Sequence, residues 1–312
     1  MIHTRRGGML VLMAAALMLV PALARAQEPA HAPSNEINIM EHLSNSHYLE
    51  LPYWNPPYTY ALELPRFPPV HIGGIAIDFS ITKHLVFLLG AALLVALVLL
   101  YTARAVARAH AENRPPRGFA GAIEAIALYI RQEVILPNVG AHGEGYVNYL
   151  LTVFFLLLTA NLLGLLPWGA TATANIAVTG AMALISLVVI EISGMRTLGL
   201  KGYLGTIFFL PEGLPTLLKP VMLVIMTPIE IIGKLAKPFA LAVRLFANMT
   251  AGHVVVLALI GLTFFFKSYT VGVLASVMAT GIMLLELFVA FLQAFVFTLL
   301  TSVFIGLMRA EH

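Results

Sequence analysis

The chain has 312 residues, of which 60% are hydrophobic and 11% are charged. Soluble globular domains carry about 25% charged residues, so this composition excludes an ordinary water-soluble globule. The absence of cysteine excludes disulfide scaffolds, thiolate metal sites and cysteine nucleophiles.

Residues 1–26 have the pattern of a secretory signal peptide. Two arginines, Arg5 and Arg6, precede a short apolar stretch, and small residues flank Arg25. The alternative is a retained membrane anchor, although the apolar stretch is short for a full span. Removal of this segment would take away three arginines and no acid, so the formal charge would fall from +3 to 0. Without a basic excess, nucleic acid is not expected as a partner.

Residues 27–83 form a polar, proline-rich segment that is expected to lie outside the membrane. It is predicted to have little regular structure, apart from a short helix near residues 37–47. Its four histidines are spaced too unevenly to predict a metal site; they are His31, His42, His47 and His71. No cofactor is expected anywhere in the chain.

Five segments are predicted to cross the membrane as helices, so the fold class is an all-α integral membrane protein. Their approximate ranges are 85–103, 146–166, 172–192, 220–266 and 268–308. The last two are overlong, because residues 220–266 would form a helix of about 70 Å against a hydrocarbon core of about 30 Å. These two helices are therefore expected to be strongly tilted, broken at Pro228 or Pro238, or partly outside the lipid.

Residues 119–136 are predicted to form an amphipathic helix along the membrane surface. Glu124, Arg131 and Glu133 make the segment too charged to span. The apolar residues expected to share one face are Ile123, Ile126, Ala127 and Ile130.

Basic residues predict the orientation of the chain, because they favour the cytoplasmic side. They follow the first and third spans, at Arg104, Arg108, Arg114, Arg117 and Arg131 and at Arg196, Lys201 and Lys219. The turn at Pro167-Trp168 has none, and Trp168 is expected at the outer interface. The final turn has only Lys267. The C-terminus is therefore predicted to be cytoplasmic and the mature N-terminus external.

Arg244 lies at the centre of the fourth span, where an unpaired arginine costs roughly 2.5–3.5 kcal/mol on insertion scales. One reading is a buried ion pair that holds two helices together; the other is a functional fixed charge, because guanidinium keeps its proton in proteins. Helical geometry places Asn248 on the same face as Arg244 and His253 on the opposite side, about 13 Å further out. Glu230 lies about 21 Å inward and within about 40° of the Arg244 face.

On the last span, Glu286 and Gln293 are one heptad apart and share a face, with Glu286 about 10 Å nearer the outside. In one antiparallel register, Gln293 is level with Arg244 and Glu286 is level with His253. This register predicts a titratable pair on the outer side of a permanent cation and Glu230 on its inner side. We expect the pair to relay protons rather than serve only as core residues.

Two half-paths on opposite sides of a fixed cation do not form a continuous pore. They can load protons onto a mobile carrier and unload them elsewhere, and Arg244 would deprotonate a passing carboxyl group. The only aspartate, Asp78, precedes the first span. The moving carboxylate is therefore expected to come from a partner.

Three stretches of the sequence strongly resemble subunit a of the F-type ATP synthases. They are Arg-Leu-Phe-Ala-Asn-Met at 244–249, Asn-Leu-Leu-Gly-Leu-Leu-Pro at 161–167 and Leu-Gln-Ala-Phe at 292–295. The resemblance extends from about residue 39 to the C-terminus.

The resemblance implies a five-span, non-catalytic stator subunit of the bacterial inner membrane, with its last two helices tilted against a ring of c subunits. Peripheral-stalk b subunits and membrane lipid are the other implied partners. Arg244 resembles the family's essential arginine, and Glu230 resembles an inner half-channel residue. The residues that resemble the outer half-channel are Asn161, Asn248, His253, Glu286 and Gln293.

Some positions differ from the best-known bacterial members. In those proteins Glu stands at the place of His253 and His at the place of Glu286, whereas mitochondrial relatives resemble the present order. Gly164 stands where the bacterial pattern has an acid.

The alternative function is a proton-coupled secondary transporter. Such a protein would favour two repeated halves with broken helices at corresponding places, and the segment around Arg244 and Asn248 is not duplicated. An intramembrane protease is less well supported, because the chain has no Gly-x-Ser-x-Gly, aspartate-pair or His-Glu-x-x-His motif.

Overall fold

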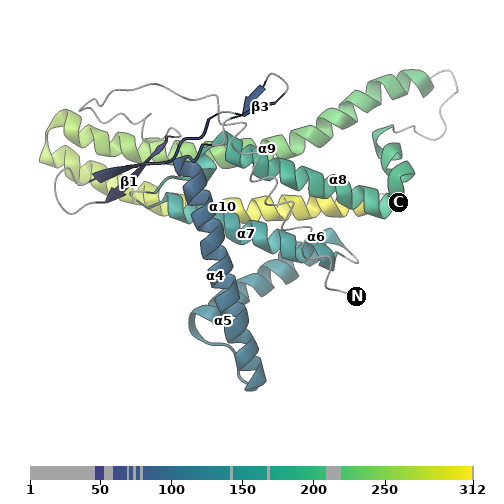
Figure 1. The fold of residues 1–312 in the computed structure, drawn as a ribbon, viewed down its shortest axis with the longest axis horizontal. Helices are drawn as coiled ribbons and strands as arrows, with labels where there is room; N and C mark the ends of the chain where they lie inside the picture. Colours follow the sequence, from purple (N-terminus) through teal and green to yellow (C-terminus); the bar gives the residue numbers. More distant parts are fainter. Residues whose placement is uncertain are drawn as a thin grey trace.

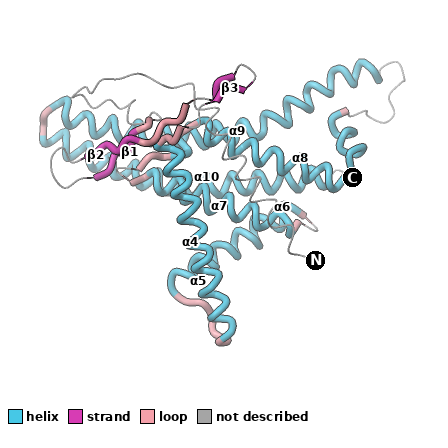
Figure 2. The backbone as a smooth tube through the Cα atoms, in the orientation of Figure 1, coloured by secondary structure: helices cyan, strands magenta, loops and turns pink. Residues whose placement is uncertain are grey.

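The computed structural model describes residues 46–52, 59–68, 70–72, 75–77, 80–140, 143–166, 169–208 and 219–310. Three predictions lie outside this part of the chain: the signal peptide, nearly all of the short helix near residues 37–47, and the position of Trp168. Helix makes up most of the described chain, and the strands are confined to its N-terminal part (Figure 2).

Within the described residues, five helices are long and apolar enough to cross a membrane, as predicted. They overlap the five predicted spans, and the fold is that of an all-α integral membrane protein. The helices are α4 (Lys83–Ala111), α7 (Glu144–Gly164), α8 (Ile176–Ile207), α9 (Lys219–Phe266) and α10 (Tyr269–Ala310).

Helices α9 and α10 have 48 and 42 residues and lie antiparallel along the length of the molecule (Figure 1). Their rise of 1.5 Å per residue gives lengths of about 72 and 63 Å, so neither can stand upright in a bilayer. The predicted break does not occur, because Pro228 and Pro238 both lie inside the continuous helix α9. Excess length is therefore accommodated by tilt or by leaving the lipid at the ends.

The most densely packed helix is α7, which contacts both α4 and α10. Tyr149, Phe154 and Leu157 are among its fully buried side chains, and Phe154 meets Phe291 of α10 edge to face at 6.0 Å. Helix α4 runs across this layer (Figure 1) and exposes leucines such as Leu93 and Leu97 on its free side. Apolar exposure of this kind suits a lipid-facing helix.

The predicted surface helix at 119–136 is more deeply packed than expected in its second half. Helix α5 (Gly118–Tyr129) continues into a π-helical segment, η2 (Ile130–Ile135), and then α6 (Leu136–Val139). The predicted apolar stripe is buried only at Ile130, and burial continues instead through η2 and α6, which contact α10. The extra residue per turn of a π-helix rotates the following side chains away from the 3.6-residue period, and the sequence pattern did not include it.

The external segment has more regular structure than predicted. Strands β1 (Tyr48–Pro52) and β2 (Thr59–Glu63) form one antiparallel pair, and β3 (Val70–Ile72) and β4 (Ile75–Ile77) form another. Within the described residues, Pro52 lies at the end of β1, and Pro65 and Pro68 lie outside the strands, where a missing N–H costs no ladder bond.

Helix α8 contains a break that places its last turns beside α9. Gly199 has φ 70° and ψ 170°, a conformation that side chains disfavour, and the helix changes direction there. The segment after Gly199 turns toward the start of α9 (Figure 1).

Candidate functional site

Arg244 and Asn248 lie on an exposed face of α9, one turn apart. The adjacent face of the same segment is buried, at Leu241, Leu245 and Met249. No ion pair of Arg244 is found among the described residues. Only 11% of the most apolar 18-residue stretch of α9 is buried, whereas 61% of the corresponding stretch of α7 is buried. Helix α9 therefore has a large surface that no other described element covers.

His253 and Glu286 form the predicted pair between α9 and α10. His253 Nδ1 lies 3.9 Å from Glu286 Oε2, and the two side chains are 17% and 11% exposed. Gln293 Nε2 donates to the backbone oxygen of Arg244 at 3.3 Å. The antiparallel register predicted from helical geometry is therefore the register of the structure.

The contacts of His253 determine which of its nitrogens carries the proton in the neutral ring. Nε2 lies 2.8 Å from the backbone oxygen of Gly164 and 3.1 Å from Thr171 Oγ1. A carbonyl oxygen can only accept, so Nε2 is the donor. The neutral imidazole then presents an unprotonated Nδ1 toward Glu286. The distance of 3.9 Å between Nδ1 and Oε2 exceeds that of a hydrogen bond, so Nδ1 is free of a hydrogen-bond partner among the described residues.

Two glycines make room for this pair. A Cβ at Gly164 would overlap the side chain of Thr171, and a Cβ at Gly252 would overlap the carboxyl group of Glu286. The acid that the bacterial pattern has at position 164 would not fit this arrangement. Gly164 instead contributes its backbone oxygen to His253.

Asn161 is fully buried. Its Nδ2 donates to the backbone oxygen of Ala290 at 3.2 Å, and its Oδ1 accepts from Thr173 at 2.7 Å. Ala290 is one turn beyond Glu286 on α10. The structure thus brings Asn161, Thr173, His253 and Glu286 close together beside α9 and α10.

Thr171 and Thr173 were not among the predicted site residues. They line this group from the short helix η3 (Ala172–Ala174) and the residue before it. Their signal was the pair of threonines in an otherwise apolar, charge-free stretch. The turn itself was predicted at Pro167-Trp168, and nothing in the spacing placed the threonines against α9.

Glu230 lies fourteen residues before Arg244 on α9 and is half-buried. The structure does not bring it into contact with Arg244 or with the His253–Glu286 pair. Its separation from Arg244 along the axis is about 21 Å, as helical geometry predicts.

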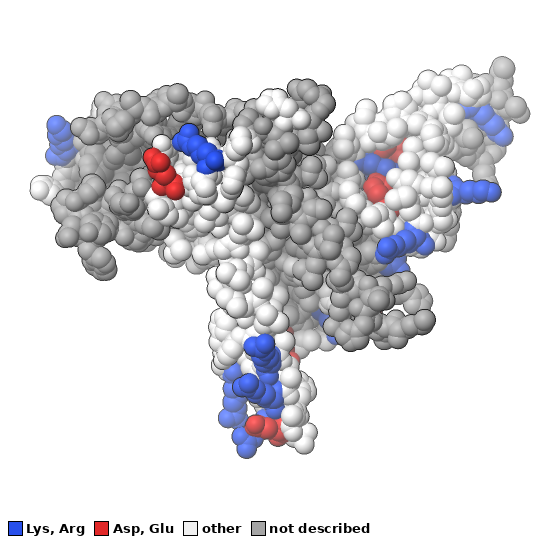
Figure 3. Space-filling model, viewed as in Figure 1, with Lys and Arg blue, Asp and Glu red and all other residues white. Residues whose placement is uncertain are grey.

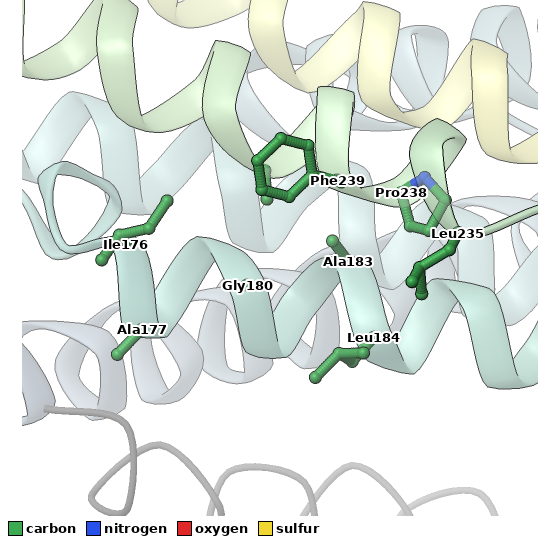
Figure 4. Close-up of a pocket in the computed structure, with 9 residues that line it drawn as sticks. Ile176, Ala177, Gly180, Ala183, Leu184, Leu235, Pro238 and Phe239 are labelled. Atoms are coloured by element: carbon green, nitrogen blue, oxygen red, sulfur yellow. The ribbon is translucent and has the colours of Figure 1, made fainter. Parts of the chain in front are cut away.

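An apolar groove of about 360 Å³ lies between α8 and α9, next to the site (Figure 4). Its walls carry no ionisable side chain, so it offers nothing to a proton or a polar substrate. The residues that line it are Ile176, Ala177, Gly180, Ala183, Leu184, Leu235, Pro238, Phe239 and Ala242.

Comparison with known proteins agrees with the resemblance seen in the sequence. The family model described as "ATP synthase A chain" matches residues 77–306. The chain belongs to this family. Its relatives include "ATP synthase subunit a 2" of Chlorobium luteolum, which is 43% identical over 92% of this chain and 82% of the relative. "ATP synthase subunit a" of Pelodictyon phaeoclathratiforme is 45% identical over 80% of this chain and 71% of the relative.

A third relative carries the same subunit name. "ATP synthase subunit a" of Myxococcus xanthus is 42% identical over 84% of this chain and 85% of its own length. Family membership makes the chain a membrane subunit of an ATP synthase that takes part in proton transport. The alternative of a secondary transporter has no support from these comparisons.

Proposed function

We propose that this chain is the stator subunit that carries protons to and from a rotating c-subunit ring through two offset half-channels. In this proposal Arg244 deprotonates each ring carboxyl group as it passes. The peripheral-stalk b subunits hold the chain still, and the c ring turns against the exposed surface of α9 and α10.

The observation that carries the proposal is the position of Arg244. It faces outward from a membrane helix and no described carboxylate neutralises it. An unpaired charge within a membrane helix raises the free energy of insertion, and a carboxylate from a partner would offset that penalty. Asn248, one turn along the same face, adds an amide that can donate to the same carboxylate.

The fixed charge of Arg244 accounts for the separation of the two half-channels. A nearby cation favours the ionised form of a carboxyl group, so a protonated ring site releases its proton on approach. Because guanidinium does not release a proton itself, Arg244 cannot pass protons directly from one half-channel to the other.

The polar residues divide between the two sides of Arg244. The outer half-channel is assigned to Asn161, His253 and Glu286, with Asn248 and Gln293 leading toward Arg244. The inner half-channel is assigned to Glu230. Two dead-end paths on opposite sides of one cation force a proton to travel with the ring between them.

The test is Arg244→Ala in the complete ATP synthase, measured in inverted membrane vesicles by the quenching of a pH-sensitive dye after ATP addition. We expect ATP-driven proton pumping to disappear, while subunit a remains in the purified complex. Arg108→Ala, at an exposed arginine near the end of α4, is the matched control and should pump normally. Normal pumping by Arg244→Ala would refute the proposed function.

A further inference from the structure

A second charged group lies between α8 and α9, away from the residues already discussed. Lys234 of α9 and Glu191 of α8 form an ion pair with Nζ 3.9 Å from Oε2, and their side chains are 12% and 18% exposed. Lys234 Nζ also donates to Thr206 Oγ1 at 3.0 Å and lies 4.7 Å from the centre of the Tyr203 ring. We call these four residues, Glu191, Tyr203, Thr206 and Lys234, the inner latch.

The inner latch depends on the break in α8. Tyr203 and Thr206 follow Gly199, where the positive φ redirects the helix, and both then lie against Lys234. Gly194 packs against this segment, because a Cβ there would meet Met308 and approach Tyr203. Lys234 therefore has a built pocket of an anion, a hydroxyl and an aromatic face.

The inner latch and the His253–Glu286 pair hold the stretch of α9 from Lys234 to His253 at its two ends. His253 is fixed by Gly164, Thr171 and Glu286, and Lys234 is fixed by α8. Lys237, one turn from Lys234, adds a contact with α10, with Nζ 5.2 Å from the Phe304 ring centre. Arg244 lies between the two anchors, and its direction is set by the rotation of the helix that they hold.

We propose that Lys234 and Glu191 are positioning residues, which fix the rotation of α9 so that Arg244 faces outward and Glu230 stays at the inner side. Arg244 is ten residues from Lys234, which places the two side chains about 80° apart around the helix axis. If α9 turned about its axis, Arg244 would turn toward α8 or α10 and away from a partner. Glu230 is one turn before Lys234 and would move with it. This inference rests on the proposed function, because it assigns a purpose to the direction of Arg244.

The test compares Lys234→Met, Glu191→Gln, Lys234→Arg and the exchange Glu191→Lys with Lys234→Glu, all in the complete ATP synthase. We expect the first two to lower ATP-driven pumping at least about fivefold, because each leaves one charge of a largely buried pair without its partner. The arginine variant and the exchange keep a pair of opposite charges, so both should retain at least about half of the pumping. Lys201→Met, at an exposed lysine after Gly199, is the matched control.

A second measurement separates positioning from simple stabilisation. The chain has no cysteine, so Ala247→Cys gives a single reporter on the exposed face beside Arg244. Its labelling rate with a water-soluble thiol reagent should change at least about threefold in the Lys234→Met background, since rotation of α9 alters its exposure. The rate should be unchanged with Lys201→Met and should return with the exchange.

The inference is wrong if Lys234→Met pumps as well as Lys201→Met, or if pumping falls while the reporter rate stays constant. If Lys234→Met does not assemble, the exchange decides: pumping by the exchange supports the inner latch, and its failure refutes it. Arg244→Ala measured in parallel distinguishes the two proposals. Loss of pumping with Arg244→Ala and normal pumping with Lys234→Met would refute only the inner latch.

Discussion

A backbone oxygen and a side-chain hydroxyl fix the orientation of the His253 ring. The Gly164 carbonyl and the Thr171 hydroxyl both lie on its Nε2 side, which leaves Nδ1 toward Glu286. Nδ1 of His253 and Oε1 of Glu286 are buried atoms without a hydrogen-bond partner among the described residues. Buried polar atoms are rarely left in this state, so a proton or water that visits between them would have favourable partners.

Removal of His253 should therefore slow proton entry. We expect His253→Leu to lower ATP-driven pumping at least about tenfold, because a positioned acid–base group typically contributes 10²–10⁴ to a proton transfer. The exchange of His253 and Glu286 should be milder than either His253→Leu or Glu286→Leu, since both titratable groups remain. Pumping in vesicles is the measurement, with His110→Leu on exposed α4 as the control. An exchanged variant no better than the single losses would contradict a paired relay.

The parts of this site that could be predicted are those that lie on the two continuous helices α9 and α10. The 3.6-residue period and an antiparallel direction were enough to pair His253 with Glu286 and Gln293 with Arg244. The contacts of Gly164, Thr171 and Thr173 were not predictable, because they depend on how the chain after α7 folds back onto α9. The sequence places Glu191 at the end of the span 172–192 and Lys234 inside the span 220–266. It does not predict their pairing, since the break at Gly199 shapes the pocket around Lys234.

Close packing of backbone against backbone fixes the contact between α10 and α6. A Cβ at Gly306 of α10 would overlap the backbone oxygen of Asn138, the penultimate residue of α6. Asn138 in turn donates from Nδ2 to the Val134 oxygen at 2.6 Å in the π-helical segment. A backbone atom cannot move aside as a side-chain tip can, so this approach requires glycine.

Gly306→Ala should destabilise the contact between α10 and α6. We expect a loss of about 1–3 kcal/mol, typical of overpacking in a rigid interior, measured as a lower temperature of thermal unfolding in purified complexes. Gly281→Ala on the same helix is the matched control, because a Cβ there meets nothing within 4 Å and alanine favours helix. Equal stability of the two variants would show that α6 can move away from α10.

The helices long and apolar enough to span a membrane could be predicted from the sequence. The geometry of the shorter elements could not. Long apolar stretches predicted the five membrane helices, since a helix satisfies its backbone hydrogen bonds within a single segment inside lipid. The π-helical turn at Ile130–Ile135 and the two hairpins of the external segment depend on local backbone pairing. Their short sequences carry too little periodicity to predict that pairing.

Charge is distributed unevenly over the whole molecule. Figure 3 shows basic side chains gathered at the lower end of the molecule, where α4 ends, with residues other than Lys, Arg, Asp and Glu above them. The arginines at the end of α4 and in the following turn are exposed: Arg104, Arg108, Arg114 and Arg117. By the positive-inside rule this end is expected to face the cytoplasm, and the turn between α9 and α10 is expected to face the opposite side.

Single cysteines test this orientation directly, because the chain contains no cysteine of its own. Ala111→Cys lies at the end of α4, and Tyr269→Cys lies at the start of α10, where the tyrosine is 96% exposed. A membrane-impermeant maleimide should label Ala111→Cys in inverted vesicles and Tyr269→Cys in right-side-out vesicles. Labelling after detergent treatment provides the control for intrinsic reactivity at both positions. The reverse pattern would place the turn between α9 and α10 in the cytoplasm. Because residues of both proposed half-channels lie on these continuous helices, the outer and inner half-channels would then be exchanged.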